Sequence, residues 1–171
     1  MFDRFGALPL VALLGRVSYA AYLWHWPLGM QSAAVPKVCP FGPRTGYSKR
    51  LFAAGDSHNN VLIEVYRRMA EGNNWGIDVA SHNGCYLTAA RNKPASDSSE
   101  SECLTWRAGA MTMARQGGYD AFIVTHAQPV IPGRGETAKQ ATVRGLVAAW
   151  RTLPDVPIVA ILDNPWRGGT S

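Results

Sequence analysis

Short apolar runs alternate with longer amphipathic segments along most of the chain. Runs that suit buried strands lie at 51–55, 76–80, 119–125 and 156–162. Segments with helical periodicity separate them, at 58–71, 104–116 and 135–153. Strands that alternate with helices of this length predict right-handed β-α-β units, and therefore an α/β fold with a mostly parallel sheet covered on both faces.

Two of the predicted helices carry an apolar stripe. The stripes consist of Val61, Leu62, Val65 and Met69 in the first helix and of Val143, Leu146, Val147 and Trp150 in the last. Charged residues such as Glu64 and Arg67 fall outside the first stripe, so we expect the stripes to form the buried faces. The chain ends soon after the fourth run, which leads us to expect a parallel sheet that is incomplete on its C-terminal side.

An uncharged, aromatic-rich segment precedes this alternating region. Residues 17–35 contain no Asp, Glu, Lys or Arg, and a bilayer crossing needs about 20 mainly apolar residues. We therefore expect one apolar helix in contact with a membrane; a buried amphipathic helix is the alternative. The three prolines and two glycines of 35–49 indicate a linker. The predicted parts are 1–34 with the apolar helix, a linker at 35–47 and a globular domain at 48–171.

Composition and charge narrow the possible partners. The 171 residues are 47% hydrophobic and carry a formal net charge of +5, which is typical of one ordinary folded domain plus a short appendage. Basic residues are dispersed from Arg4 to Arg167, and aromatic residues do not interleave with them. The sequence therefore predicts no nucleic-acid partner.

The three cysteines do not have the spacing of a metal site. No CxxC pair occurs, so we expect neither a zinc site nor a cofactor. Cys85 and Cys103 bracket a polar loop and suit a disulfide, which implies an oxidising compartment. Three unpaired buried thiols are the alternative, and Cys39 stays unpaired in either case.

The candidate nucleophile lies where the first apolar run gives way to a helix. Gly55-Asp56-Ser57-His58 places Ser57 on a strand-to-helix turn, and in a parallel sheet such turns meet at the carboxyl edge where ligands bind. This position suits acyl transfer. A second interpretation is structural, because Asp56 and Ser57 are both favoured helix N-caps.

Other candidate residues follow the next two predicted strands. His82 and His126 come after the second and third strands, so either of them is a candidate base for Ser57. His58 adjoins Ser57, and we expect it to shape the pocket rather than act as the base.

Three polar positions at the same edge suit oxyanion donors: Asn83, Gly84 and Gln128. Their structural interpretations are a turn at Asn83-Gly84 and a strand end at Gln128.

Two blocks in this order resemble a known family. Residues 15–28 resemble the late transmembrane segment of acyltransferase-3 membrane proteins, and Gly55-Asp56-Ser57-His58 resembles the first block of the SGNH hydrolase-like domain that is often fused to them. Three further landmarks of that domain are Gly84-Cys85, the run at 103–107 and Asp163-Asn164-Pro165. The resemblance implies a flavodoxin-like three-layer fold and bacterial O-acylation of a cell-envelope glycan.

The resemblance also implies roles for individual residues. Ser57 carries the acyl group delivered by a membrane acyltransferase domain, and the backbone N–H groups of Ser57 and Gly84 stabilise the tetrahedral intermediate. The asparagine of the family's third block has no match, and His126 and Gln128 stand near its place. The late Asp-x-x-His pair that supplies the family's base does not occur; Asp78 and His82 are four residues apart and lie too early.

These departures lead us to expect a fragment, with 1–34 as the remnant of the membrane domain. The resemblance places the SGNH-like domain outside the bacterial inner membrane, whereas Lys37, Arg44, Lys49 and Arg50 after the apolar segment favour the inside. A membrane segment missing between Met30 and Pro36 would reconcile the two. The alternatives to an acyltransferase are a free-standing esterase and an inactive remnant that binds glycan.

Overall fold

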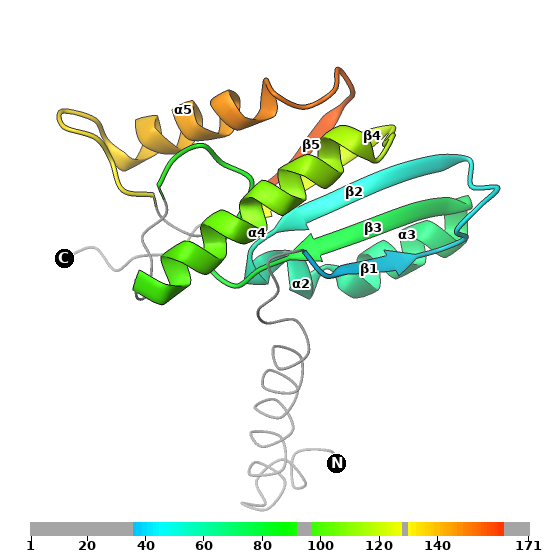
Figure 1. Ribbon diagram of the computed structural model, residues 1–171. Coiled ribbons are helices and arrows are strands. Elements are labelled where there is room, and N and C mark those ends of the chain that lie inside the picture. The colour runs from blue at the N-terminus through cyan, green and yellow to red at the C-terminus, as the bar shows by residue number, and fades with distance from the viewer. Residues whose placement is uncertain (1–35, 92–96, 128–129, 163–171) are drawn as a thin grey trace, which may run out of the picture. The chain divides into compact units, whose positions relative to one another are not determined.

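A five-stranded sheet with the order β1–β3–β2–β4–β5 has helices on both faces (Figure 1). The computed structural model describes residues 36–91, 97–127 and 130–162. The strands are β1 (Val38–Phe41), β2 (Lys49–Gly55), β3 (Trp75–Ser81), β4 (Ala121–His126) and β5 (Ile158–Leu162). The helices are α2 (Ser57–Val61), α3 (Ile63–Asn73), α4 (Asp97–Gln116) and α5 (Ala138–Trp150). Neighbours among β3, β2, β4 and β5 are parallel, so the prediction of an α/β fold with a mostly parallel sheet is confirmed.

The strand order creates a switch point between β2 and β4. The chain moves from β2 to β3 on one side, then crosses back over β2 to β4 and continues to β5. This is the order of a flavodoxin-like doubly wound sheet, in which ligands bind at the carboxyl ends of the two strands where the direction reverses. The motif containing Ser57 follows β2 directly at this point.

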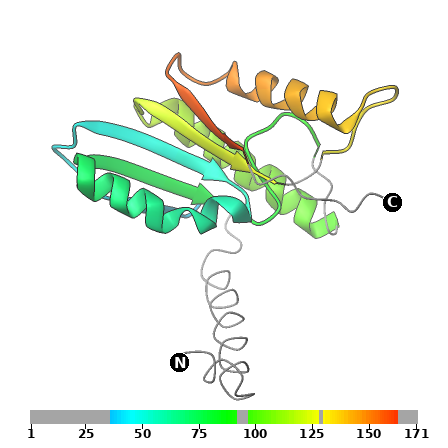
Figure 2. The ribbon, with the colours of Figure 1, turned by 180° about the vertical axis from the view of Figure 1, so that it is seen from behind.

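Successive residues of the central strands alternate between two apolar cores. Towards α4 and α5, β2 contributes Phe52 and Ala54. Towards α3, it contributes Leu51 and Ala53. Figure 2 shows α3 lying against β3 on this second side, opposite α4. Burial on both faces explains why the strand sequences are apolar runs rather than alternating patterns.

The segment predicted to be a linker contributes a strand to the sheet. β1 pairs antiparallel with β3, with Cys39 opposite Val79 and Phe41 opposite Ile77. The prediction of a plain linker at 35–47 is wrong in this respect. The strand is only four residues long, and the prolines and glycines in and around it are typical of a loop. Pro40 fits the outermost described position of the sheet, since edge strands tolerate a residue without an N–H donor.

The predicted apolar stripes are only partly the buried faces of the helices. Leu62, Met69, Leu146 and Trp150 pack against the cores, whereas the four valines of the stripes are exposed. The first helix is interrupted at Leu62, and the residues it buries after that break are Ile63, Tyr66 and Ala70. Val61, which the stripe placed inside, is 78% exposed. A break of this kind shifts the phase of the helix, so a stripe counted across it matches the buried face only in part.

In α5 the buried residues are small: Ala141, Gly145 and Ala149. Val143 and Val147 are exposed instead. A Cβ atom at Gly145 would collide with the side chains of Thr88 and Ala90. The helix therefore packs its smallest residues against a loop, and close approach of backbones outweighs side-chain hydrophobicity.

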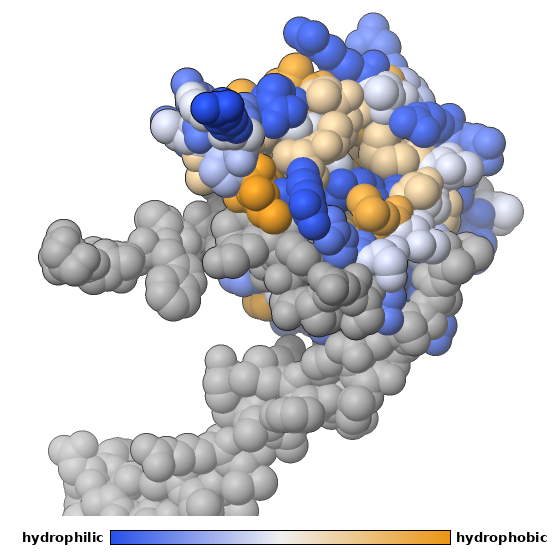
Figure 3. Space-filling view, turned by 60° about the vertical axis from the view of Figure 1, so that its left-hand side comes forward, coloured by the Kyte–Doolittle hydropathy of each residue, from blue (hydrophilic) through white to orange (hydrophobic). Residues whose placement is uncertain are grey.

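The surface seen in Figure 3 has hydrophilic residues interspersed with apolar ones. Within the described residues, no helix is long and apolar enough to cross a membrane. The apolar segment predicted at 17–35 lies outside the described residues, as does 163–171.

Candidate active site

The turn between β2 and α2 separates the two roles that the sequence left open for Asp56 and Ser57. Asp56 is the N-cap of α2, and its Oδ1 accepts a hydrogen bond from the backbone N–H of His58 at 3.0 Å. Ser57 is the first residue of the helix and is half-buried. Capping therefore belongs to Asp56, which leaves Ser57 as the candidate nucleophile.

Asp56 also joins this turn to the end of β4. Its side chain is fully buried, and Oδ2 accepts a hydrogen bond from the backbone N–H of Ala127 at 2.6 Å. Gly55 permits the close approach, because a Cβ atom there would collide with the carbonyl oxygen of Thr125. Asp56 thus fixes the Ser57 turn against β4 at the switch point of the sheet.

A second turn lies beside the first, at the end of β3. The backbone N–H of His82 donates to the carbonyl of Gly55 at 3.1 Å, which extends the β2–β3 pairing by one residue. The N–H of Cys85 closes the turn onto the carbonyl of His82 at 3.1 Å, and Gly84 has a φ of +71°. Only glycine adopts this conformation readily, so the turn itself explains Gly84. Its predicted role as an oxyanion donor, like that of Asn83, stays a prediction.

One face of α4 holds this second turn in place. Cys103 forms a disulfide with Cys85, with their Cα atoms 5.4 Å apart. One helical turn later, the ring of Trp106 lies 5.7 Å from that of His82, centroid to centroid. The Arg107 guanidinium then donates to the carbonyl of Ala90 at 3.1 Å. Residues 103–107 of α4 therefore hold the loop after β3 in place through a disulfide, a ring contact and a hydrogen bond.

His126 occupies the end of β4, on the other side of the Ser57 turn from β3. Its ring stacks on Tyr86 with centroids 4.4 Å apart and planes 14° apart. The Tyr86 side chain is 1% exposed, and its hydroxyl has no hydrogen-bond partner among the described residues. Burial raises the pKa of Tyr86 to about 12, so the hydroxyl keeps its proton at neutral pH.

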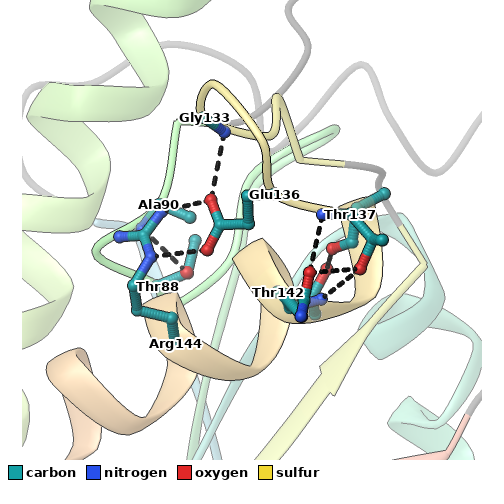
Figure 4. Close-up of polar contacts among 9 residues, drawn as sticks. Thr88, Ala90, Gly133, Glu136, Thr137, Thr142 and Arg144 are labelled. Atoms are coloured by element: carbon teal, nitrogen blue, oxygen red, sulfur yellow. Dashed lines mark hydrogen bonds and ion pairs between the residues drawn. The ribbon is translucent and has the colours of Figure 1, made fainter.

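The loop that carries Tyr86 rests on α5 (Figure 4). The N–H of Ala89 donates to the carbonyl of Gly145 at 2.9 Å. In the loop before α5, Glu136 accepts hydrogen bonds from Gly133 and from Arg144, at 3.0 and 2.8 Å, and Thr137 caps the helix. These contacts hold the loop that carries Tyr86, on whose ring His126 stacks. The sequence gives no signal for Tyr86, because a tyrosine in a loop belongs to no periodic pattern.

Asp78 cannot orient His82, although the two are four residues apart in the sequence. Asp78 is buried within β3 and accepts hydrogen bonds from Arg50 at 2.8 Å and from Tyr119 at 2.9 Å. Asp78 lies in the middle of β3, and four residues along a strand span about 13 Å, so His82, just past the carboxyl end of the strand, is far from it. The Asp78 carboxylate instead binds Arg50 and Tyr119, which lie near the amino ends of β2 and β4.

The structure thus gathers Ser57, the His82–Gly84 turn and His126 at one edge of the sheet. His58 is half-buried directly after Ser57. Gln128, the remaining predicted donor, lies outside the described residues. Among the described residues, no group of three or more His, Cys, Asp or Glu side chains is arranged to hold a metal ion.

A family model described as "SGNH domain (fused to AT3 domains)" matches residues 25–165. The chain belongs to this family. The match covers the SGNH domain and no AT3 domain, so the interpretation of 1–34 as the end of such a domain stays a prediction. Comparisons with curated proteins and with solved structures gave no match. Family membership assigns hydrolase-like acyl chemistry to the SGNH domain.

Proposed function

We propose that the SGNH domain is an O-acyltransferase that moves an acyl group, most simply acetyl, onto a hydroxyl of a cell-envelope glycan. The observation that carries the proposal is the position of Ser57 at the switch point of the sheet, freed from capping by Asp56. The family's fusion to AT3 domains supports a membrane acyltransferase domain as the source of the acyl group.

The proposed reaction has two steps. The Ser57 Oγ attacks the acyl carbon, loses its proton to a base, and releases the donor's alkoxide, which takes up that proton. A sugar hydroxyl then attacks the acyl-serine in the same way, so that the acyl group passes to the glycan and Ser57 is regenerated. Backbone N–H groups around Ser57 and Gly84 are the proposed oxyanion donors.

The proposed location is the extracytoplasmic side of the bacterial inner membrane. The Cys85–Cys103 disulfide supports it, because such bonds persist in oxidising compartments and are rare in the cytosol of mesophiles.

The test is to expose the protein to an activated acyl ester and to follow Ser57 by mass spectrometry. We expect an acyl adduct on Ser57 that is absent from Ser57→Ala and that passes to an oligosaccharide faster than to water. Rapid loss to water alone would indicate the esterase. No adduct would indicate the inactive remnant and refute the proposal.

A further inference from the structure

We propose that Asn59 and Tyr66 are positioning residues for Ser57: the hydrogen bond between them holds the short helix α2, and the serine that begins it, against the end of the sheet. The inference rests on the proposed acyl chemistry at Ser57. Both residues act through α2 and do not touch the reacting atoms.

Ser57 depends on the backbone of α2 for its position. Within the described part of the chain, the Ser57 side chain makes no hydrogen bond of its own, and the helix that carries it, Ser57–Val61, has only five residues. A helix this short is not stable by itself in water. It is joined to α3 through Leu62, whose φ of −87° and ψ of 0° lie in the sparsely populated bridge region. The position of Ser57 is therefore set by the side chains that attach α2 to its surroundings.

Asn59 attaches α2 to the end of β3. Its side chain is fully buried, and Nδ2 donates to the Ser81 hydroxyl at 2.9 Å. Ser81 is the last residue of β3 and is paired with Gly55, the last residue of β2. A buried side-chain amide needs partners for both its nitrogen and its oxygen. The contact with Ser81 satisfies the nitrogen and fixes α2 at the carboxyl edge of the sheet.

Tyr66 satisfies the oxygen of the same amide from α3. Its hydroxyl donates to Asn59 Oδ1 at 2.7 Å, across the break at Leu62. The Tyr66 side chain is 1% exposed and belongs to the core between α3 and the sheet, so the hydroxyl is held by the packing of its ring. Burial raises the pKa of Tyr66 to about 12, so the hydroxyl keeps the hydrogen that it donates at neutral pH. Tyr66 thus holds the Asn59 amide in the orientation that also binds Ser81.

Two buried polar residues together hold α2 at the switch point of the sheet. Asp56 binds the Ala127 N–H at the end of β4, and Asn59 binds Ser81 at the end of β3. Positions three residues apart lie on the same side of a helix, and Ser57 lies between these two in the sequence. Its Oγ and its N–H, the proposed nucleophile and oxyanion donor, move with α2. A small shift of the helix therefore misplaces both groups at once.

The experiment compares the rate of Ser57 acylation by p-nitrophenyl acetate in the unsubstituted protein, Tyr66→Phe, Asn59→Ala and the double variant. Tyr66→Phe removes one hydroxyl and keeps the ring. We expect it to slow acylation at saturating ester about 10- to 100-fold, because a misplacement of about 1 Å can cost about 100-fold, with the half-saturating ester concentration nearly unchanged. Because both residues act through one hydrogen bond, Tyr66→Phe should cost much less when Asn59 is already alanine.

Tyr119→Phe is the matched control, because it removes another buried tyrosine hydroxyl, one that binds Asp78 at 2.9 Å just before β4. We expect it to lower the urea midpoint at least as much as Tyr66→Phe and to leave the acylation rate nearly unchanged. Equal losses of rate in the two variants, or acylation of Tyr66→Phe within about threefold of the unsubstituted rate, would overturn the inference while adducts on Ser57 still support the proposed function. An unsubstituted protein with no Ser57 adduct would overturn both.

A second measurement follows α2 directly. The backbone N–H groups of Asn59 and Leu62 donate to the carbonyls of Asp56 and Asn59. Their hydrogen exchange should be faster in Tyr66→Phe than in the unsubstituted protein, while the later turns of α3 exchange as before. Unchanged exchange at both N–H groups would overturn the inference, and this result decides the matter if Asn59→Ala does not fold.

Discussion

Reduction of the Cys85–Cys103 disulfide is expected to destabilise the SGNH domain. The bond joins residues 18 apart in the sequence. In the chain-entropy account, a closed loop of this length removes about 10 to 11 cal/mol/K from the unfolded chain, which is about 3 kcal/mol at 25 °C. For a urea m-value of about 2 kcal/mol/M, this corresponds to a midpoint lower by about 1.5 M.

The same bond supports the site, so activity should fall with stability. Cys85 directly follows Gly84, and Cys103 lies one helical turn before Trp106, which packs on His82. Without the bond, the turn after β3 keeps its hydrogen bonds but is no longer attached to α4. We therefore expect slower Ser57 acylation at urea concentrations where the reduced domain is still folded.

The assay is urea unfolding with and without dithiothreitol, followed by fluorescence of the tryptophans. The Cys85→Ala/Cys103→Ala variant should unfold at a low midpoint that no longer responds to reductant. Cys39→Ala is the matched control, because Cys39 has a free thiol, and its midpoint should fall with reductant as in the unsubstituted protein. A midpoint shift below about 0.3 M, or peptide mapping that finds Cys39 in the bond, would refute the reasoning.

Three further predictions follow from single contacts. Gly55→Ala forces a Cβ atom into the Thr125 carbonyl and should cost roughly 1–3 kcal/mol in urea unfolding. Gly72→Ala, with no atom within 4 Å of the added Cβ and no left-handed φ, should show no such loss. Asp56→Ala removes the bonds to His58 and Ala127 and should cost at least about 2 kcal/mol, with a matching loss of Ser57 acylation; an unchanged midpoint would contradict the role given to Asp56. Burial raises the pKa of Tyr66 from 10.0 to about 12, so its stabilisation is complete below pH 10 and is lost as the pH rises towards 12. Alkaline unfolding of Tyr66→Phe should therefore depend less steeply on pH over that interval.

The sequence predicts the sequential order of the parallel strands and helices well because each depends on local periodicity. Buried parallel strands are apolar throughout, so runs such as 51–55 stand out from their neighbours. Because both faces of such a strand are buried, its position in the sequence can be predicted without knowing which strands lie beside it. The antiparallel β1 lacks this signal, because it is short, lies at the described edge of the sheet and contains Pro40.

The buried faces of the helices depend on tertiary contacts that no local pattern records. Gly145 faces inward because the loop at Thr88 and Ala90 leaves no room for a side chain. A count of apolar residues therefore favours Val143 and Val147, which are larger but exposed. The phase break at Leu62 has the same effect on the first helix, since it rotates every later residue relative to Val61.

The Ser57 turn shows why the sequence can locate the candidate nucleophile but cannot tell whether Asp56 or Ser57 caps the helix. Asp56 and Ser57 are equally good caps by type, and only the bond from Asp56 to the His58 N–H assigns the cap. The second oxygen of Asp56 then bonds to Ala127, 71 residues away. One buried carboxylate thus caps α2 and also binds the backbone at the end of β4. The second contact explains why the residue is aspartate, because a serine cap has one side-chain oxygen and cannot accept from two N–H groups on opposite sides. The neighbouring serine is left to face the open edge, where the parallel topology also brings His82.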